Sequence, residues 1–200
     1  PNATKKWQLR TFHREGLYLK FNKHNNVCII TNEKVDYEEF DKIIVLESDY
    51  SKEQEWKMNN EWQVFNSTPF KHSIKLEADM LFTENTDWWW NYLYQYNMVF
   101  SYYCRNYKDD IIKQTRYRQL FVQNNLPNIY NGLTYFRWSH EANTFYNLCR
   151  DITFNWDAVK EKCLINCHDK QPTTDVVYAL ANKILDPAQE RSVKYDWFNF

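Results

Sequence analysis

Two carboxylates that follow a predicted strand could together hold a divalent metal. The strand runs over residues 72–76, and Glu77-Ala78-Asp79 comes directly after it. Two carboxylates so close together can turn toward one point where a strand ends, and their hard oxygen atoms suit Mg²⁺ or Mn²⁺. A metal bound there could bridge a diphosphate and neutralise it as a leaving group. Taken alone, a Glu-x-Asp pattern is more often an acidic turn that faces solvent.

A third carboxylate, Asp175, is predicted to open a helix. Thr173 and Thr174 precede it and are candidate N-cap residues. The helix dipole stabilises a carboxylate at that position, where it could face a ligand. It could equally be an ordinary acidic residue of a first helical turn, and the sequence does not separate these two interpretations.

Cations and aromatic rings alternate over residues 105–118, a composition found where proteins bind phosphates or stack on bases. Arg116 and Arg118 are the candidate phosphate contacts of this segment. Asp109 and Asp110 interrupt it, so a helix face with local ion pairs remains the simpler interpretation. The run of three tryptophans at 88–90 could offer a ring for stacking on a sugar. Consecutive helical residues point about 100° apart, so at most one or two of the rings could do so, and core packing is the simpler alternative.

The elements that must position these residues alternate between strands and helices. Strands are predicted over 27–31, 42–46, 72–76, 98–104 and 129–138, the last bent around an Asn131-Gly132 turn. Helices are predicted over 8–22, 52–65, 88–93, 113–124, 141–154, 156–164 and 175–185. The alternation predicts an α/β fold with a mostly parallel central sheet flanked by helices, in which ligands bind at the carboxyl ends of strands. No linker or repeat divides the chain, so residues 1–200 are expected to form a single domain.

Composition excludes several classes of protein. The chain has 200 residues, of which 18% are aromatic, and only two are glycines. The chain therefore contains no glycine-rich phosphate-binding loop, which disfavours P-loop kinases and dinucleotide-binding dehydrogenases. The net charge of -1 gives no overall field for nucleic acid or an anionic membrane, and the longest apolar runs are far too short to cross a bilayer.

The cysteine count points to a reducing compartment. Five cysteines, an odd number, are scattered along the chain and make a poor disulfide framework. A cytoplasmic location is therefore expected.

The sequence around the first two carboxylates resembles a known family. Leu76-Glu77-Ala78-Asp79-Met80-Leu81 is similar to the Asp-x-Asp signature of nucleotide-sugar glycosyltransferases of the GT-A fold, with Glu in place of the first Asp. The resemblance covers roughly residues 27–186. It includes the strand 131–136, similar to the one that lines the acceptor side of the family's cleft, and the segment 172–177, similar to the helix-opening Asp motif that faces the donor sugar. The whole resembles the small glycosyltransferase-like proteins of tailed phages.

The resemblance implies a site and a reaction. Glu77 would reach the ribose or the metal, and Asp79 would bind the metal, which would be Mn²⁺ or Mg²⁺. Asp175 would contact the sugar or stabilise charge at its anomeric carbon and is the candidate catalytic residue. Asn131, Gly132 and the two arginines at 116 and 118 would contact the acceptor or phosphates.

The partners implied are a nucleoside-diphosphate sugar as donor and a modified DNA base or a glycan as acceptor. The location implied is the host cytoplasm if the protein is phage-encoded.

The chain also departs from the family pattern. No apolar strand precedes the predicted helix at 8–22, and no His follows His168. These departures suggest a domain truncated at both ends or a divergent, inactive member. Paired carboxylates also serve Mg²⁺-dependent nucleotidyltransferases and phosphohydrolases, and a non-catalytic binding or structural protein on a transferase-like scaffold is the third alternative.

Overall fold

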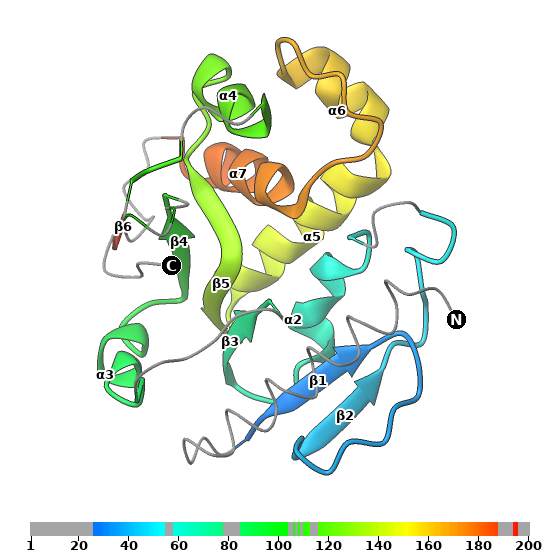
Figure 1. Cartoon of the computed structure of the whole chain (residues 1–200), viewed down its shortest axis with the longest axis vertical. Helices are drawn as coiled ribbons and strands as arrows, with labels where there is room; N and C mark the ends of the chain where they lie inside the picture. Colours follow the sequence, from blue (N-terminus) through cyan, green and yellow to red (C-terminus); the bar gives the residue numbers. More distant parts are fainter. Residues whose placement is uncertain are drawn as a thin grey trace.

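A computed structural model describes residues 26–54, 58–77, 85–103, 106, 108, 110–112, 116–187 and 194–195. These residues form a mixed α/β arrangement of two small sheets and several helices (Figure 1). The α/β class predicted from the sequence is confirmed. The predicted helix at 8–22 and the candidate metal ligand Asp79 lie outside the described residues.

The smaller sheet pairs β1 (Cys28–Thr31) with β2 (Lys42–Val45) in parallel, as predicted, with Cys28 opposite Lys42. Neither strand is buried along its length. Ile29 is the only fully buried residue of the pair, and Val45 is 45% exposed. A sheet of only two strands cannot bury the side chains on both of its faces. The apolar run therefore correctly predicts a strand here, but not a deeply buried one.

The larger sheet has the strand order β3-β5-β4-β6 and is mainly antiparallel. Strands β3 (His72–Leu76) and β4 (Met98–Tyr102) both run antiparallel to the central β5 (Ile129–Arg137), and β6 (Lys194–Tyr195) runs parallel to β4. The prediction of a mostly parallel central sheet is therefore wrong for this sheet. Continuous apolar runs indicate burial on both faces but not strand direction, and helices cover both faces of this antiparallel sheet too.

Strand β5 continues through Asn131 and Gly132, where the sequence predicted a turn. Phe100 of β4 pairs with Thr134, but the next residue, Ser101, pairs with Tyr130, so residues 131–133 form a bulge on the β4 side. On the β3 side the pairing is regular, and the Glu77 amide extends it by donating to the Gly132 carbonyl at 3.0 Å. An Asn-Gly pair often marks an irregularity of the backbone. Here the irregularity is a bulge, and neither Asn131 nor Gly132 has the positive φ of a turn residue.

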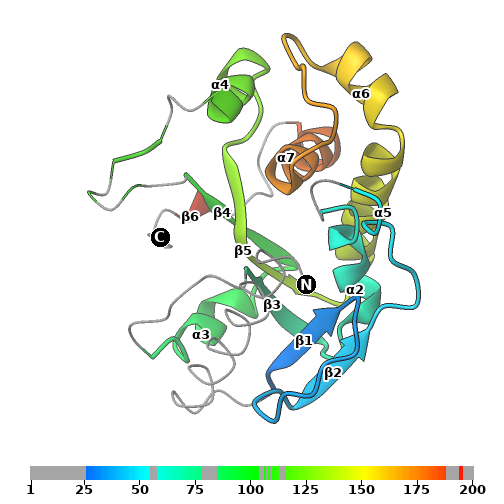
Figure 2. The same ribbon diagram turned by 45° about the vertical axis from the view of Figure 1, so that its right-hand side comes forward.

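Helices cover the two faces of the larger sheet (Figures 1 and 2). On one face α5 (His140–Phe154) and α7 (Thr174–Leu185) pack against each other, and α7 packs on β5. Their aromatic and aliphatic side chains form the main core with Phe100, Ile129 and Phe136 of the sheet. On the other face the short α3 (Trp89–Leu93) packs on Val99, Leu133 and Tyr135.

The remaining helices are short or peripheral. They are α4 (Arg116–Gln123), α6 (Trp156–Cys163), the 3₁₀ turn η1 (Glu61–Gln63) and α2 (Val64–Ser67). The long helix predicted over 52–65 is therefore wrong in its first half. Asn60 explains the interruption, because its side chain accepts a hydrogen bond from the Tyr50 amide at 2.9 Å and donates one to Asp49 at 2.7 Å, and both bonds compete with helix formation. Across the described residues, no helix is long and apolar enough to span a membrane.

Candidate functional site

Three segments predicted to form a site meet in the structure. Glu77, at the carboxyl end of β3, is hydrogen-bonded through its amide to the Gly132 carbonyl of β5. The next amide back along β5, that of Asn131, donates to Asp175 Oδ1 of α7 at 2.8 Å. Residues far apart in the sequence are thus linked by two hydrogen bonds at the end of β3, next to the bulge in β5.

Asp175 is held at the first turn of α7, as predicted. Thr173 is the N-cap, and its hydroxyl accepts a hydrogen bond from the Val176 amide at 3.4 Å. The Asp175 carboxylate is almost completely buried, with 7% of the residue exposed. Its second oxygen, Oδ2, accepts from Arg118 Nη2 at 2.6 Å, so both oxygens have donors.

Arg118 does not lie on an exposed basic strip. It is 2% exposed, and its guanidinium donates to the Ile129 carbonyl at 2.8 Å and to Asn128 Oδ1 at 2.9 Å as well as to Asp175. The predicted role of Arg118 as a contact for phosphate is therefore replaced by one in positioning Asp175. Alternation of cations and rings along the sequence could not show which face of α4 packs inward. Arg116 begins α4, and its side chain lies outside the described residues.

Glu77 and Lys75 bring further charge to the end of β3. Glu77 Oε2 accepts a long hydrogen bond of 3.5 Å from the Tyr130 hydroxyl. Lys75, on the same face of β3 by strand alternation, is paired with Glu61 at 2.7 Å and reaches the Asn131 carbonyl at 3.4 Å. The sequence analysis missed Lys75 and Glu61. The signal available was a lysine two residues before the Glu-x-Asp pair, between the apolar Ile74 and Leu76 of the strand.

Two uncharged groups complete the surroundings. The Asn131 side chain is 1% exposed, and its Oδ1 has no hydrogen-bond partner among the described residues. Tyr178 of α7 and Tyr146 of α5 lie in the adjoining core. Burial, with a smaller contribution from Glu61, raises the pKa of both phenols well above 10, so both are neutral at physiological pH. The neighbourhood of Asp175 therefore consists of paired charges and neutral polar groups.

The donor set at this place fits a hard divalent cation that is completed by a ligand. Glu77 supplies a carboxylate at the carboxyl end of β3, and the described residues contain no cluster of three His, Cys, Asp or Glu that could hold a metal by itself. Mg²⁺ is commonly held by one or two carboxylates plus substrate phosphates and does not need an all-protein cage. Glu77, with Asp79 two residues further along, matches that pattern in number and kind of ligand.

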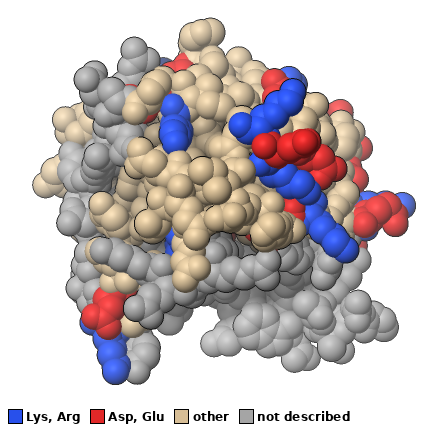
Figure 3. Space-filling view, turned by 90° about the horizontal axis from the view of Figure 1, so that it is seen from above, with Lys and Arg blue, Asp and Glu red and all other residues tan. Residues whose placement is uncertain are grey.

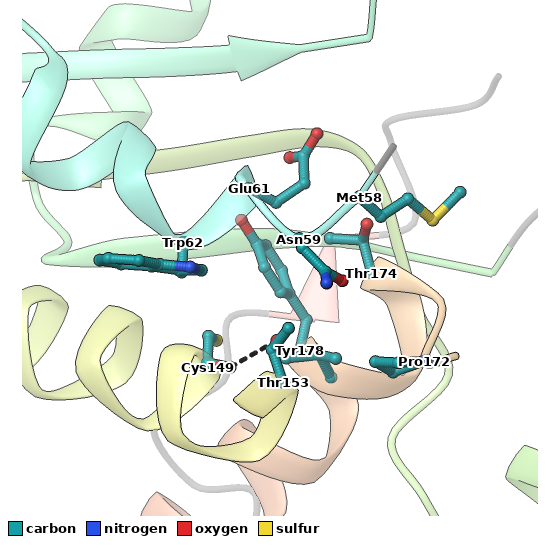
Figure 4. Close-up of a pocket in the computed structure, with 10 residues that line it drawn as sticks. Met58, Asn59, Glu61, Trp62, Cys149, Thr153, Pro172, Thr174 and Tyr178 are labelled. Atoms are coloured by element: carbon teal, nitrogen blue, oxygen red, sulfur yellow. Dashed lines mark hydrogen bonds between the residues drawn. The ribbon is translucent and has the colours of Figure 1, made fainter. Parts of the chain in front are cut away.

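Two hollows lie in the surface of the described residues, and the first adjoins the site, because Glu61, Thr174 and Tyr178 are among its lining residues. Figure 4 shows the first, between the segment around Glu61 and Trp62, α5 and the start of α7, with Tyr178 inside. Its volume of about 10 Å³ is far below the several hundred Å³ of a typical ligand pocket, so it cannot be a nucleotide site. The second is an apolar groove of about 500 Å³ between α5, α6 and α7, and Ile152, Val159 and Leu180 are among its lining residues.

On the face seen in Figure 3, the charged side chains of the described residues do not gather into a basic patch. In the view from above, lysines and arginines alternate with aspartates and glutamates at one side, around a broad uncharged area (Figure 3). This mixture agrees with the net charge of -1. It gives no support on that face to a surface that follows a nucleic-acid backbone.

No protein-family model, curated protein or solved structure matches the chain. The convergence of Glu77, Asn131, Gly132 and Asp175 is therefore judged by its own geometry, because fold class alone does not specify function.

Proposed function

We propose that the protein is a metal-dependent glycosyltransferase of GT-A-like architecture that uses a nucleoside-diphosphate sugar. The observation that carries the proposal is the meeting of the end of β3, the bulge in β5 and the start of α7. These are the three segments on which the resemblance to GT-A transferases rests. They are distant in the sequence, so their contact is an independent reason to treat them as one site.

Glu77 and Asp79 have the donor role in this proposal. Their carboxylates would hold Mn²⁺ or Mg²⁺, which when bound neutralises charge on a departing diphosphate. Glu77 is fixed through its backbone to β5, and its side chain accepts a hydrogen bond of 3.5 Å from the Tyr130 hydroxyl.

Asp175 fits an electrostatic role better than that of a general base. Its two oxygens accept hydrogen bonds from a guanidinium and from a backbone amide, which fix the carboxylate firmly in place. A carboxylate held in this way can stabilise positive charge that develops on a sugar ring, but it has little capacity left to accept a proton. Arg118 is then a positioning residue for Asp175.

The experiment that tests the proposal is calorimetric titration of a panel of nucleoside diphosphates and their sugars, with and without Mn²⁺. We expect metal-dependent binding to the unaltered chain, weakened by a factor of about 10 or more in Asp79→Ala and in Glu77→Gln. Asp157→Ala is the matched control, because this carboxylate in the first turn of α6 is 89% exposed. Binding that is independent of metal, or equal in all the variants, would refute the proposed site.

Product analysis then separates the transferase from the other metal-dependent enzymes. Release of a nucleoside diphosphate together with a transferred or hydrolysed sugar supports sugar transfer. Release of a nucleoside monophosphate, or cleavage of a phosphate ester, would instead indicate a nucleotidyltransferase or a phosphohydrolase. Absence of turnover and of nucleotide binding would leave the non-catalytic binding protein.

A further inference from the structure

Aromatic side chains surround the short helix α3 and several are exposed. Trp88 is 48% exposed, Tyr92 47% and Tyr94 51%. Large aromatic residues normally bury most of their surface, so three half-exposed rings within seven residues of one segment are unusual. The Leu93 side chain of the same helix is fully buried on the sheet, so α3 is firmly anchored while it presents these rings to solvent.

The exposed rings are held in fixed orientations. Trp88 lies edge-on to Tyr92, with ring centroids 5.9 Å apart and planes at 90°, and edge-on to Trp89 at 6.3 Å and 88°. Tyr94 stacks on Trp90 at 5.6 Å, and Trp90 in turn contacts Tyr135 of β5. Rings fixed by their neighbours lose little side-chain entropy when a ligand binds, so they are suited to act as preformed platforms.

The charge of the segment selects the class of ligand. Residues 85–97 contain no lysine, arginine or histidine and a single acid, Asp87. Lys71 and Arg137 lie beside His72, which Tyr94 contacts edge-on with centroids 4.7 Å apart. Nucleic acids and anionic membranes require basic residues, and residues 85–97 supply none. A neutral ligand with a flat apolar face fits better.

Side-chain amides accompany the rings and could bond hydroxyl groups. Asn85, Asn91, Gln95 and Asn97 lie in the same segment. Gln95 donates to the Asn91 carbonyl at 3.2 Å, and Asn85 bonds Asp87 both through its side-chain amide at 3.1 Å and through its Oδ1 at 2.7 Å. Side-chain amides both donate to and accept from hydroxyls, a carboxylate accepts from them, and rings cover the C–H face of a pyranose. This combination matches a carbohydrate.

We propose that Trp88, Tyr92 and the flanking polar residues of α3 form a carbohydrate-binding surface for a neutral oligosaccharide. Its helix packs on Leu133 and Tyr135, on the face of the sheet opposite α7, and Tyr94 lies against His72 at the amino end of β3. The identity of this ligand as the acceptor rests on the proposed transferase function. If that function holds, the acceptor is a glycan and not a modified DNA base. The binding itself requires neither donor nor metal.

The test is calorimetric titration of the full chain, without nucleotide or metal, with neutral hexasaccharides of glucose and of N-acetylglucosamine in α- and β-linked forms. We expect at least one to bind, and Trp88→Ala and Tyr92→Ala each to weaken it by about fivefold or more. Tyr50→Ala is the matched control: Tyr50 is 44% exposed and packs on Phe154 of α5, across the sheet from α3. Its variant should bind as the unaltered chain does.

The results that overturn the proposal are distinct. No binding to any of the hexasaccharides, or binding that both α3 variants leave unchanged, refutes it. Loss of binding to a single-stranded oligonucleotide or to phosphatidylserine vesicles in the same variants, with no oligosaccharide bound, would assign the surface to those ligands instead. Because no nucleotide is present, a failed donor titration leaves this result intact, and failure here leaves the donor site untouched.

Discussion

The buried ion pair between Arg118 and Asp175 provides the sharpest test of the site's construction. Replacing Arg118 with Met removes the donor to Asp175 Oδ2, 2.6 Å away, and leaves the Ile129 carbonyl and Asn128 Oδ1 without this donor. The pair is almost fully enclosed, with side chains 1% and 9% exposed. Removing one partner from such a pair costs about 3–5 kcal/mol of unfolding free energy, because the remaining charge stays buried and loses its ion-pair partner.

A second Arg–Asp pair in the same chain supplies the control. Arg150 and Asp151 are bonded at 2.8 Å, but their side chains are 40% and 56% exposed. Water compensates the charge that remains there, so Arg150→Met should cost no more than about 1 kcal/mol, including its contact with the Trp62 ring. The two substitutions are chemically identical and differ in the burial of the pair and in the two further acceptors that Arg118 serves, the Ile129 carbonyl and Asn128 Oδ1.

Chemical denaturation of both variants, followed by circular dichroism and by tryptophan fluorescence, measures the difference. A cycle that adds Asp175→Leu isolates the coupling, which we expect to be about 2 kcal/mol or more in favour of the intact pair. Equal losses in Arg118→Met and Arg150→Met would refute the claim that burial makes the first pair important. A coupling near zero would refute the claim that Arg118 positions Asp175.

Two further predictions follow from the packing near the site. Gly132→Ala should lower the unfolding free energy by about 1–3 kcal/mol, because the added Cβ would lie 2.5 Å from Tyr130 Cε1. In chemical denaturation, the double variant with Tyr130→Ala should be less destabilised than the sum of the two single variants. Strict additivity of the two losses would contradict the clash. Tyr178→Phe should change the unfolding free energy at pH 8 by less than about 1 kcal/mol, since the Tyr178 hydroxyl interacts with the buried Tyr146 hydroxyl but forms no hydrogen bond of normal geometry with a described residue. Burial raises the pKa of this phenol, so the unfolded chain loses its proton first, near pH 10, and stability falls above that pH. The variant should therefore lose less stability than the unaltered chain in denaturation measured between pH 10 and 11, and parallel losses would contradict the raised pKa.

Much of the fold could be predicted from local signals. The apolar runs at 28–31, 42–45 and 72–76 are strands, and the Thr173 cap correctly marked the start of α7. Strand direction was not predictable, because the antiparallel pairing of β3 and β5 depends on which distant segment enters between β3 and β4. An apolar run indicates that a strand is buried, but it does not indicate which strand it pairs with or in which direction.

The candidate site, like the fold, could be predicted from the sequence only in part. The pattern of residue types identified Glu77, Asn131, Gly132 and Asp175, and the structure brings them together. The pattern could not assign Arg118, because charge spacing on a helix is the same whether that face meets solvent or core. Arg118 is buried because Asp175 and the Ile129 carbonyl, which lie on other elements, accept hydrogen bonds from its guanidinium.

The pairing of β6 with β4 matters for how the protein can be handled. Strand β4 reads Met-Val-Phe-Ser-Tyr and is buried along its whole length. Its outer edge is covered at Phe100 and Ser101 by Lys194 and Tyr195. A shortened chain that stops after α7 would uncover an apolar strand edge of the kind that recruits other chains into cross-strand aggregates. The pairing of Lys194 and Tyr195 with β4 therefore opposes self-association through this edge, and fusion or tagging is safer when these two residues are kept.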